Sequence, residues 1–175
     1  MDASAFPPFR AAGPGSGWLL PGLELRQADG TTPAPLWAYR GRGPLLVFLH
    51  EGPQCAACAA RLAALATAYA GYREQGCQVL AVGPAPVAGL PYPVLVDSGA
   101  RLAAALGLRP PALLVVGRTG EIWAAWGGAH AALPPAAEVA SWLEYALGEC
   151  RECFCCEPVW PEAEGRDAPA GAPDA

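Results

Sequence analysis

The stretch LLVFLHEGPQCAAC, residues 45–58, determines the fold that this chain can adopt. Its first five residues are all apolar, which is typical of a strand buried on both faces of a parallel sheet. A loop with glycine and proline follows, and from Cys55 onward apolar residues recur every three or four positions, which indicates a helix. The sequence therefore predicts a strand, a loop and a helix whose first turn carries Cys55 and Cys58.

The flanking segments extend this unit into an α/β domain. Upstream, residues 22–39 predict a ribbon that turns at Asp29-Gly30 and returns through residues 36–39. Downstream, the helix ends at Gly76, and we expect strands at 77–82 and 92–96, a short helix at 100–106, a hairpin over 112–126 and a last helix at 135–147. This order of elements predicts a three-layer α/β/α sandwich with a mixed central β-sheet.

The two ends of the chain differ in composition from this domain. Residues 1–20 are rich in glycine, proline and alanine and predict a flexible arm, so the folded domain is expected to span residues 21–149. Residues 150–175 form a cysteine-rich segment followed by an acidic tail of proline and alanine, for which we expect disorder.

The overall composition limits the class of protein and its partners. Of the 175 residues, 53% are hydrophobic and 15% are charged, which favours a folded globule. A net charge of -5 provides no electrostatic attraction for nucleic acid or for an anionic membrane surface, and no apolar run approaches the roughly 18 residues of a membrane span. We therefore expect neither nucleic acid nor membrane as a partner.

The N-terminus and the cysteines together suggest the compartment. A basic segment followed by an apolar run, the pattern of a secretory signal, is absent from residues 1–20, and we expect a cytoplasmic protein. Seven cysteines in a cytoplasmic chain indicate redox or metal chemistry before they indicate structural disulfides.

Cys55 and Cys58 are the candidate catalytic residues. Two thiols three residues apart in the first turn of a helix lie on the same side and can close a small disulfide ring. The free N–H groups and partial positive charge of a helix N-terminus favour the thiolate, although the helix end alone contributes only about 0.3–1 kcal/mol. Inert packing of both cysteines, or half of a zinc site, are the alternatives. Their place after a buried strand favours redox chemistry.

Three further motifs resemble one known family. They are VFL at 47–49 leading to the Cys55 helix, YPVLVD at 92–97 leading to LAAALGL at 102–108, and PALLVVGRTGEI at 111–122. In this order they resemble the redoxin group of the thioredoxin superfamily, which includes the alkyl hydroperoxide reductase/thiol-specific antioxidant proteins. The resemblance implies a thioredoxin-like fold.

The same resemblance implies roles for individual residues. Pro111, preceded by Pro110, would be a cis-proline that faces the dithiol and binds substrate. By analogy with thioredoxin, Cys55 would attack and Cys58 would resolve the mixed disulfide, whereas by analogy with the peroxidases Cys58 would be the reactive sulfur.

Side chains near the dithiol are candidates for accepting its proton. His50 and Glu51 stand in the loop before Cys55, and histidine titrates near neutral pH. Either could be the proton acceptor. His130 lies in a distant loop of small residues, and we expect less of it.

The resemblance covers both a reductase branch and a peroxidase branch. Its peroxidases carry Thr or Ser three residues before the reactive cysteine, whereas this chain has Gly52 before Cys55 and Cys55 before Cys58. They also carry an arginine near the position of Pro111, where only the offset Arg109 is found. These departures favour a thiol–disulfide oxidoreductase without a bound cofactor, acting on protein or small disulfides. A peroxidase acting on peroxides and a redox-inert, metal-carrying interaction protein are the alternatives.

A second group of cysteines follows the last predicted helix. Its four thiols suit a redox relay, a local disulfide or a metal site, but their spacing matches no standard zinc finger or ferredoxin. Some redoxin-like bacterial proteins end in a similar pair of cysteines, which favours Cys150 and Cys153 as the meaningful pair, and we assign no metal. The four are Cys150, Cys153, Cys155 and Cys156.

Overall fold

The apolar run at the start of the deciding stretch forms β3 (Leu45–Leu49), a strand in which every side chain is buried. In the computed structural model, which describes residues 19–148, β3 lies between β4 (Gln78–Gly83) and β6 (Ala112–Val116). It pairs in parallel with β4 and antiparallel with β6. A strand with neighbours on both sides and layers on both faces must be apolar throughout, which explains the uninterrupted run.

Seven strands form one mixed sheet in the order β2-β1-β5-β4-β3-β6-β7. The β4–β5 pair is parallel like β3–β4, and the pairs made by the outer strands are antiparallel. The predicted mixed sheet is therefore confirmed. The remaining strands are β1 (Glu24–Gln27), β2 (Pro33–Pro35), β5 (Val94–Val96) and β7 (Ile122–Gly127).

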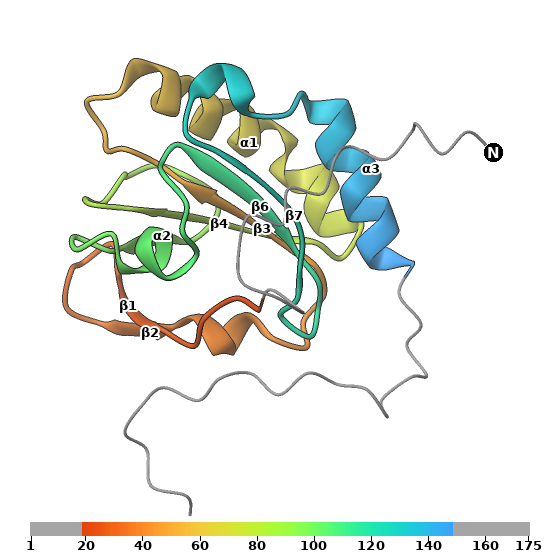
Figure 1. Cartoon of the computed structure of the whole chain (residues 1–175), viewed down its shortest axis with the longest axis horizontal. Helices are drawn as coiled ribbons and strands as arrows, with labels where there is room; N and C mark the ends of the chain where they lie inside the picture. The colour runs from red at the N-terminus through yellow and green to blue at the C-terminus, as the bar shows by residue number, and fades with distance from the viewer. Residues whose placement is uncertain (1–18, 149–175) are drawn as a thin grey trace, which may run out of the picture.

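Helices cover the two faces of this sheet unequally (Figure 1). The long helix α1 (Ala56–Glu74) and α3 (Ala136–Leu147) pack on one face, where Leu62 of α1 and Leu143 of α3 belong to the same core cluster. On the other face, Leu102 of the short α2 (Arg101–Ala105) packs in a second cluster. Helices on both faces make the α/β/α sandwich that the order of elements predicted.

The dithiol helix begins where the sequence places it. Cys55 is the N-cap of α1, and its side chain accepts a hydrogen bond from the backbone N–H of Cys58. Leu62 and Leu65 then form the buried side of the helix. The chain leaves the helix at Gly76, whose φ of +81° is readily adopted only by glycine.

Two predictions at the start of the domain are corrected. The return strand of the ribbon is β2, while residues 36–39 form a short 3-10 helix. The sheet can accept Pro33 and Pro35 because β2 is an edge strand, where the missing N–H groups break no ladder. In addition, Leu20, which we expected in the flexible arm, is fully buried and donates its N–H to the Gly120 carbonyl.

Among residues 19–148, no helix has both the length and the apolar character that crossing a bilayer requires.

We predict opposite effects on stability from two glycine-to-alanine substitutions. A Cβ at Gly83 in β4 would lie 2.2 Å from the imidazole of His50, which is buried, so Gly83→Ala is expected to destabilise the fold by about 1–3 kcal/mol. A Cβ at Gly71 in α1 would meet nothing within 4 Å, so Gly71→Ala should stabilise the fold by about 0.5–1 kcal/mol. Urea unfolding of both variants measures the difference. Equal stability of the two would contradict this packing.

Candidate active site

The two cysteines at the start of α1 have different surroundings. Cys55 is partly exposed, and its sulfur lies 3.3 Å from the backbone N of Cys58. Cys58 is fully buried, and its sulfur accepts a hydrogen bond of 3.4 Å from the backbone N–H of Glu51. Both are free thiols in this structure. One sulfur is therefore open to a substrate, and the other is held behind it.

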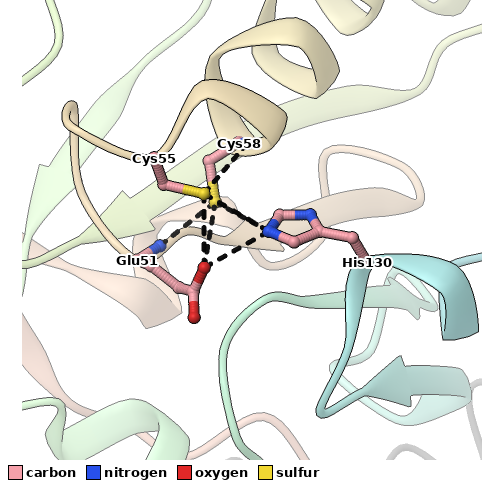
Figure 2. A group of neighbouring side chains, drawn as sticks. All are labelled: Glu51, Cys55, Cys58 and His130. Carbon is pink, nitrogen blue, oxygen red and sulfur yellow. Dashed lines mark hydrogen bonds and ion pairs between the residues drawn. The ribbon is translucent and has the colours of Figure 1, made fainter.

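Two polar side chains converge on these sulfurs (Figure 2). Glu51 Oε2 and His130 Nε2 each lie 3.3 Å from Cys55 Sγ and 3.9 Å from Cys58 Sγ. They are also 3.2 Å from each other. Glu51, Cys55, Cys58 and His130 are called the four-residue cluster below, because their reactive atoms all lie within 4.8 Å of one another.

The register of three strands brings His130 to the dithiol. Leu49 at the end of β3 pairs with Ala112 of β6, and Ala112 pairs with Gly127 at the end of β7. Because β3 and β7 both run antiparallel to β6, their carboxyl ends meet at one edge of the sheet. The chain beyond β7 enters the short 3-10 helix η3 (His130–Ala132), which begins with the histidine.

The same register places the proline step at this edge. Pro111 immediately precedes Ala112, and the peptide bond between Pro110 and Pro111 is cis. The cis geometry is the one that the sequence resemblance implied for Pro111. The Pro111 carbonyl accepts a hydrogen bond from the N–H of Gly128, which ties this step to the segment that leads to His130.

Burial and hydrogen bonding act in opposite directions on the ionisable groups of the cluster. Burial raises the pKa of the Cys58 thiol to about 11. The hydrogen bond from the Cys55 side chain, followed by the one with His130, lowers the pKa of Glu51. At neutral pH the structure therefore holds a protonated Cys58 next to an ionised Glu51 carboxylate.

His50 does not belong to the cluster, which corrects our expectation of a loop residue beside the dithiol. Its N–H continues the β3–β4 ladder to the Val82 carbonyl, and its side chain is only 1% exposed. Its Nδ1 accepts a hydrogen bond from the N–H of Gly52, and burial lowers its pKa. The ring lines a cavity of about 270 Å³ together with Gly83 and Asp97, and Glu51 of the cluster also lines this cavity.

His130 takes the place that the sequence assigns to His50 or Glu51, although the sequence predicts less of a role for it. The only sequence signal for His130 is its position just after the predicted hairpin. Without the strand register, no pattern shows that this loop reaches residues some 75 positions earlier. Glu51, the other predicted proton acceptor, does lie beside both sulfurs.

The remaining cysteines fall into two groups. Cys77 is buried in the core cluster beneath α1, and burial raises the pKa of its thiol to about 11. Cys150, Cys153, Cys155 and Cys156 lie outside the described residues, and their roles stay predictions.

The mixed sheet with helices on both faces and the dithiol at a helix N-terminus are features of thioredoxin-like proteins, and known structures of this fold resemble the chain. Similar solved structures include peroxidoxin BcpB from Mycobacterium tuberculosis (TM-score 0.60, 16% identity, covering 75% of this chain and 94% of that one). A protein from Chlorobium tepidum described as a putative thiol:disulfide interchange protein DsbE has a TM-score of 0.62 at 20% identity, covering 77% of this chain and 99% of that one. Enterococcus faecalis AhpC has a TM-score of 0.63 at 20% identity, covering 74% of this chain and 90% of that one. The thioredoxin-like fold is thereby confirmed.

A family model identifies the group within this class. The model of the AhpC/TSA family matches residues 17–125, which is more than half of the chain. This protein therefore belongs to the AhpC/TSA family. No curated protein matches the sequence. The family supports a thiol oxidoreductase or a thiol peroxidase, and the site geometry bears on the choice between them.

We predict that the two cysteines of the site react at very different rates with iodoacetamide. With a pKa of about 11, Cys58 is thiolate in only about one molecule in 10⁴ at pH 7, and its sulfur is buried. Cys55 should therefore be alkylated first, and Cys58 as slowly as the buried Cys77. Timed alkylation followed by tandem mass spectrometry assigns each site. Modification of Cys58 before Cys55 would contradict this order.

Proposed function

We propose that this protein is a thiol–disulfide oxidoreductase that works through a mixed disulfide on Cys55. The observation that carries the proposal is the inequality of the pair: a partly exposed sulfur at the helix N-terminus and a fully buried one three residues further along. Exchange by a dithiol needs one sulfur that a substrate disulfide can reach and a second thiol close enough to resolve the mixed disulfide.

In the first step, the Cys55 thiolate attacks one sulfur of a substrate disulfide. A bond forms between Cys55 Sγ and that sulfur, the substrate S–S bond breaks, and the second substrate sulfur leaves as a thiolate that takes up a proton. The backbone N–H of Cys58, 3.3 Å from Cys55 Sγ, donates a hydrogen bond to the attacking sulfur at the N-terminus of α1.

In the second step, Cys58 attacks Cys55 Sγ and releases the remaining substrate sulfur as a thiolate. Cys58 must first lose its proton, and Glu51 Oε2 and His130 Nε2, both 3.9 Å from its sulfur, are the neighbouring acceptors. The dithiol has then lost two electrons and two protons, and the substrate disulfide has gained them. An external thiol restores the starting state. We propose the cytoplasm as the compartment, since thiols are kept reduced there.

Thiol peroxidase activity is the second candidate, because the family and the similar structures include peroxiredoxins. The site favours it less. A peroxidatic cysteine reacts as a thiolate, and burial raises the pKa of Cys58 to about 11. The side chains that meet the sulfurs are a carboxylate and an imidazole, and the cluster contains neither the hydroxyl nor the arginine of the peroxidase pattern.

We predict that the full chain catalyses the reduction of insulin by dithiothreitol. Cys55→Ser should reduce the rate to the uncatalysed background, because the attacking sulfur is lost. When pre-reduced Cys58→Ser is mixed with insulin in the absence of dithiothreitol, it should accumulate a mixed disulfide with substrate on Cys55, since the site then holds no second thiol to resolve it. Precipitation of the insulin B chain measures the rate, and non-reducing mass spectrometry detects the mixed disulfide.

Cys77→Ala is the matched control, because this buried thiol lies outside the four-residue cluster. Its rate should equal that of the unaltered protein. Undiminished turnover by Cys55→Ser would rule out the proposal. Hydrogen peroxide consumption without insulin reduction, with a sulfenic acid trapped on Cys55 or Cys58, would establish the peroxidase instead.

A further inference from the structure

The four-residue cluster has the arrangement of a metal site as well as that of a redox site. Its four donor atoms come from the segment between β3 and the first turn of α1 and from the start of η3, which the sheet register holds together, and all four lie within 4.8 Å of one another. Figure 2 shows the carboxylate, the imidazole and both thiols pointing at one common point. Such convergence is the first requirement for coordinating a single ion.

The separations fit a tetrahedron around zinc. With Zn–S of about 2.3 Å and Zn–N and Zn–O of about 2.0–2.2 Å, ideal tetrahedral coordination separates sulfur from nitrogen or oxygen by roughly 3.5–3.6 Å. The same geometry separates nitrogen from oxygen by roughly 3.4 Å. The four edges that join a sulfur to nitrogen or oxygen measure 3.3, 3.3, 3.9 and 3.9 Å, and Glu51 Oε2 to His130 Nε2 measures 3.2 Å.

Hydrogen bonding to the Glu51 and His130 side chains accounts less well for the position of Cys58, whose closer hydrogen bond is the one of 3.4 Å from the backbone N–H of Glu51. Its sulfur lies 3.9 Å from both Glu51 Oε2 and His130 Nε2, which is near the outer limit for a hydrogen bond even to sulfur. For two ligands of one zinc ion the same separation needs an adjustment of only about 0.3 Å. Glu51 and His130 keep 45% and 34% of their side chains exposed, so an ion can enter from solvent.

The donor set selects the metal. Two thiolates and an imidazole suit zinc, and carboxylate oxygen is an accepted fourth ligand. Calcium and magnesium require six or more oxygen ligands and would leave both sulfurs unused. Two thiolates and one carboxylate around Zn²⁺ also leave a net charge of only about -1, which partial exposure can solvate.

We propose that the reduced cluster binds one Zn²⁺ ion through Cys55 Sγ, Cys58 Sγ, Glu51 Oε2 and His130 Nε2, and that the metal-bound and disulfide forms exclude each other. The proposal uses the dithiol of the proposed function but does not require substrate turnover. Binding replaces the thiol protons by the metal. Oxidation by glutathione disulfide removes two electrons and two protons from the pair and yields two molecules of glutathione, so both sulfurs must be free of metal.

Metal binding can be measured on the full chain in which the four C-terminal cysteines are replaced by serine, since these could hold zinc themselves. We expect one Co²⁺ ion per reduced chain, with the visible absorption of tetrahedral cobalt and a thiolate-to-metal charge-transfer band, and displacement of that ion by Zn²⁺. Competition with a chromophoric chelator then gives the zinc affinity of each variant.

The variants separate a four-ligand site from a simple dithiol. Cys55→Ser and Cys58→Ser should each weaken zinc binding by about 100-fold or more, since even partners outside the ligand set are worth about 10- to 100-fold. Glu51→Gln and His130→Ala should each weaken it by about 10- to 100-fold and change the cobalt spectrum. Glu74→Gln, on the exposed last turn of α1, is the control and should leave both unchanged.

Oxidation by glutathione disulfide tests whether the metal-bound form and the disulfide form exclude each other. At free Zn²⁺ of 100 times the dissociation constant, disulfide formation should slow by about 100-fold. Because His130→Ala raises that constant by about 10- to 100-fold, its disulfide formation should slow by only about 2- to 11-fold at the same Zn²⁺ concentration. Absence of bound metal, or an affinity insensitive to both Glu51→Gln and His130→Ala, would overturn the proposal. Normal insulin reduction without zinc binding rejects the metal site alone, whereas zinc binding without insulin reduction rejects the proposed function alone.

Discussion

The register that joins Leu49, Ala112 and Gly127 across three strands is the constraint on which the site depends. It places the end of β3, the proline step before β6 and the loop after β7 at one edge of the sheet. Each of these segments is short and could adopt many conformations by itself. Because β3 and β6 are buried and paired on both sides, and β7 is paired along β6, the ends of these strands are held in fixed relative positions, and the side chains beyond them meet.

The same edge creates the difference between the two thiols. Cys55 caps α1 and is partly open to solvent, whereas Cys58, one turn further, lies in the core cluster between α1 and the sheet. Helix geometry places the two sulfurs on one side, and packing of α1 on the sheet then buries only the second. Chemistry that needs one accessible and one protected sulfur follows directly from how this helix is seated.

The proposed redox exchange and the proposed metal binding would draw on the same four side chains for a common physical reason. Both processes require the two sulfurs to lose their protons. In exchange, a neighbouring side chain must accept the proton, and in metal binding the neighbouring side chains must coordinate the ion that displaces it. Glu51 and His130 meet this requirement in either case. The two states compete because a sulfur engaged in an S–S bond has no lone thiolate charge to offer a metal.

The sequence by itself determined the elements and the dithiol, because these depend on local patterns. Uninterrupted apolar residues specified β3, the three- and four-residue spacing specified α1, and the CxxC motif at its start identified both thiols. Only the tertiary structure decided that His130 joins the site, that His50 is buried away from it, and that the ribbon returns through β2. These outcomes depend on strand register and sheet-edge position, which are contacts between distant residues that no local pattern encodes.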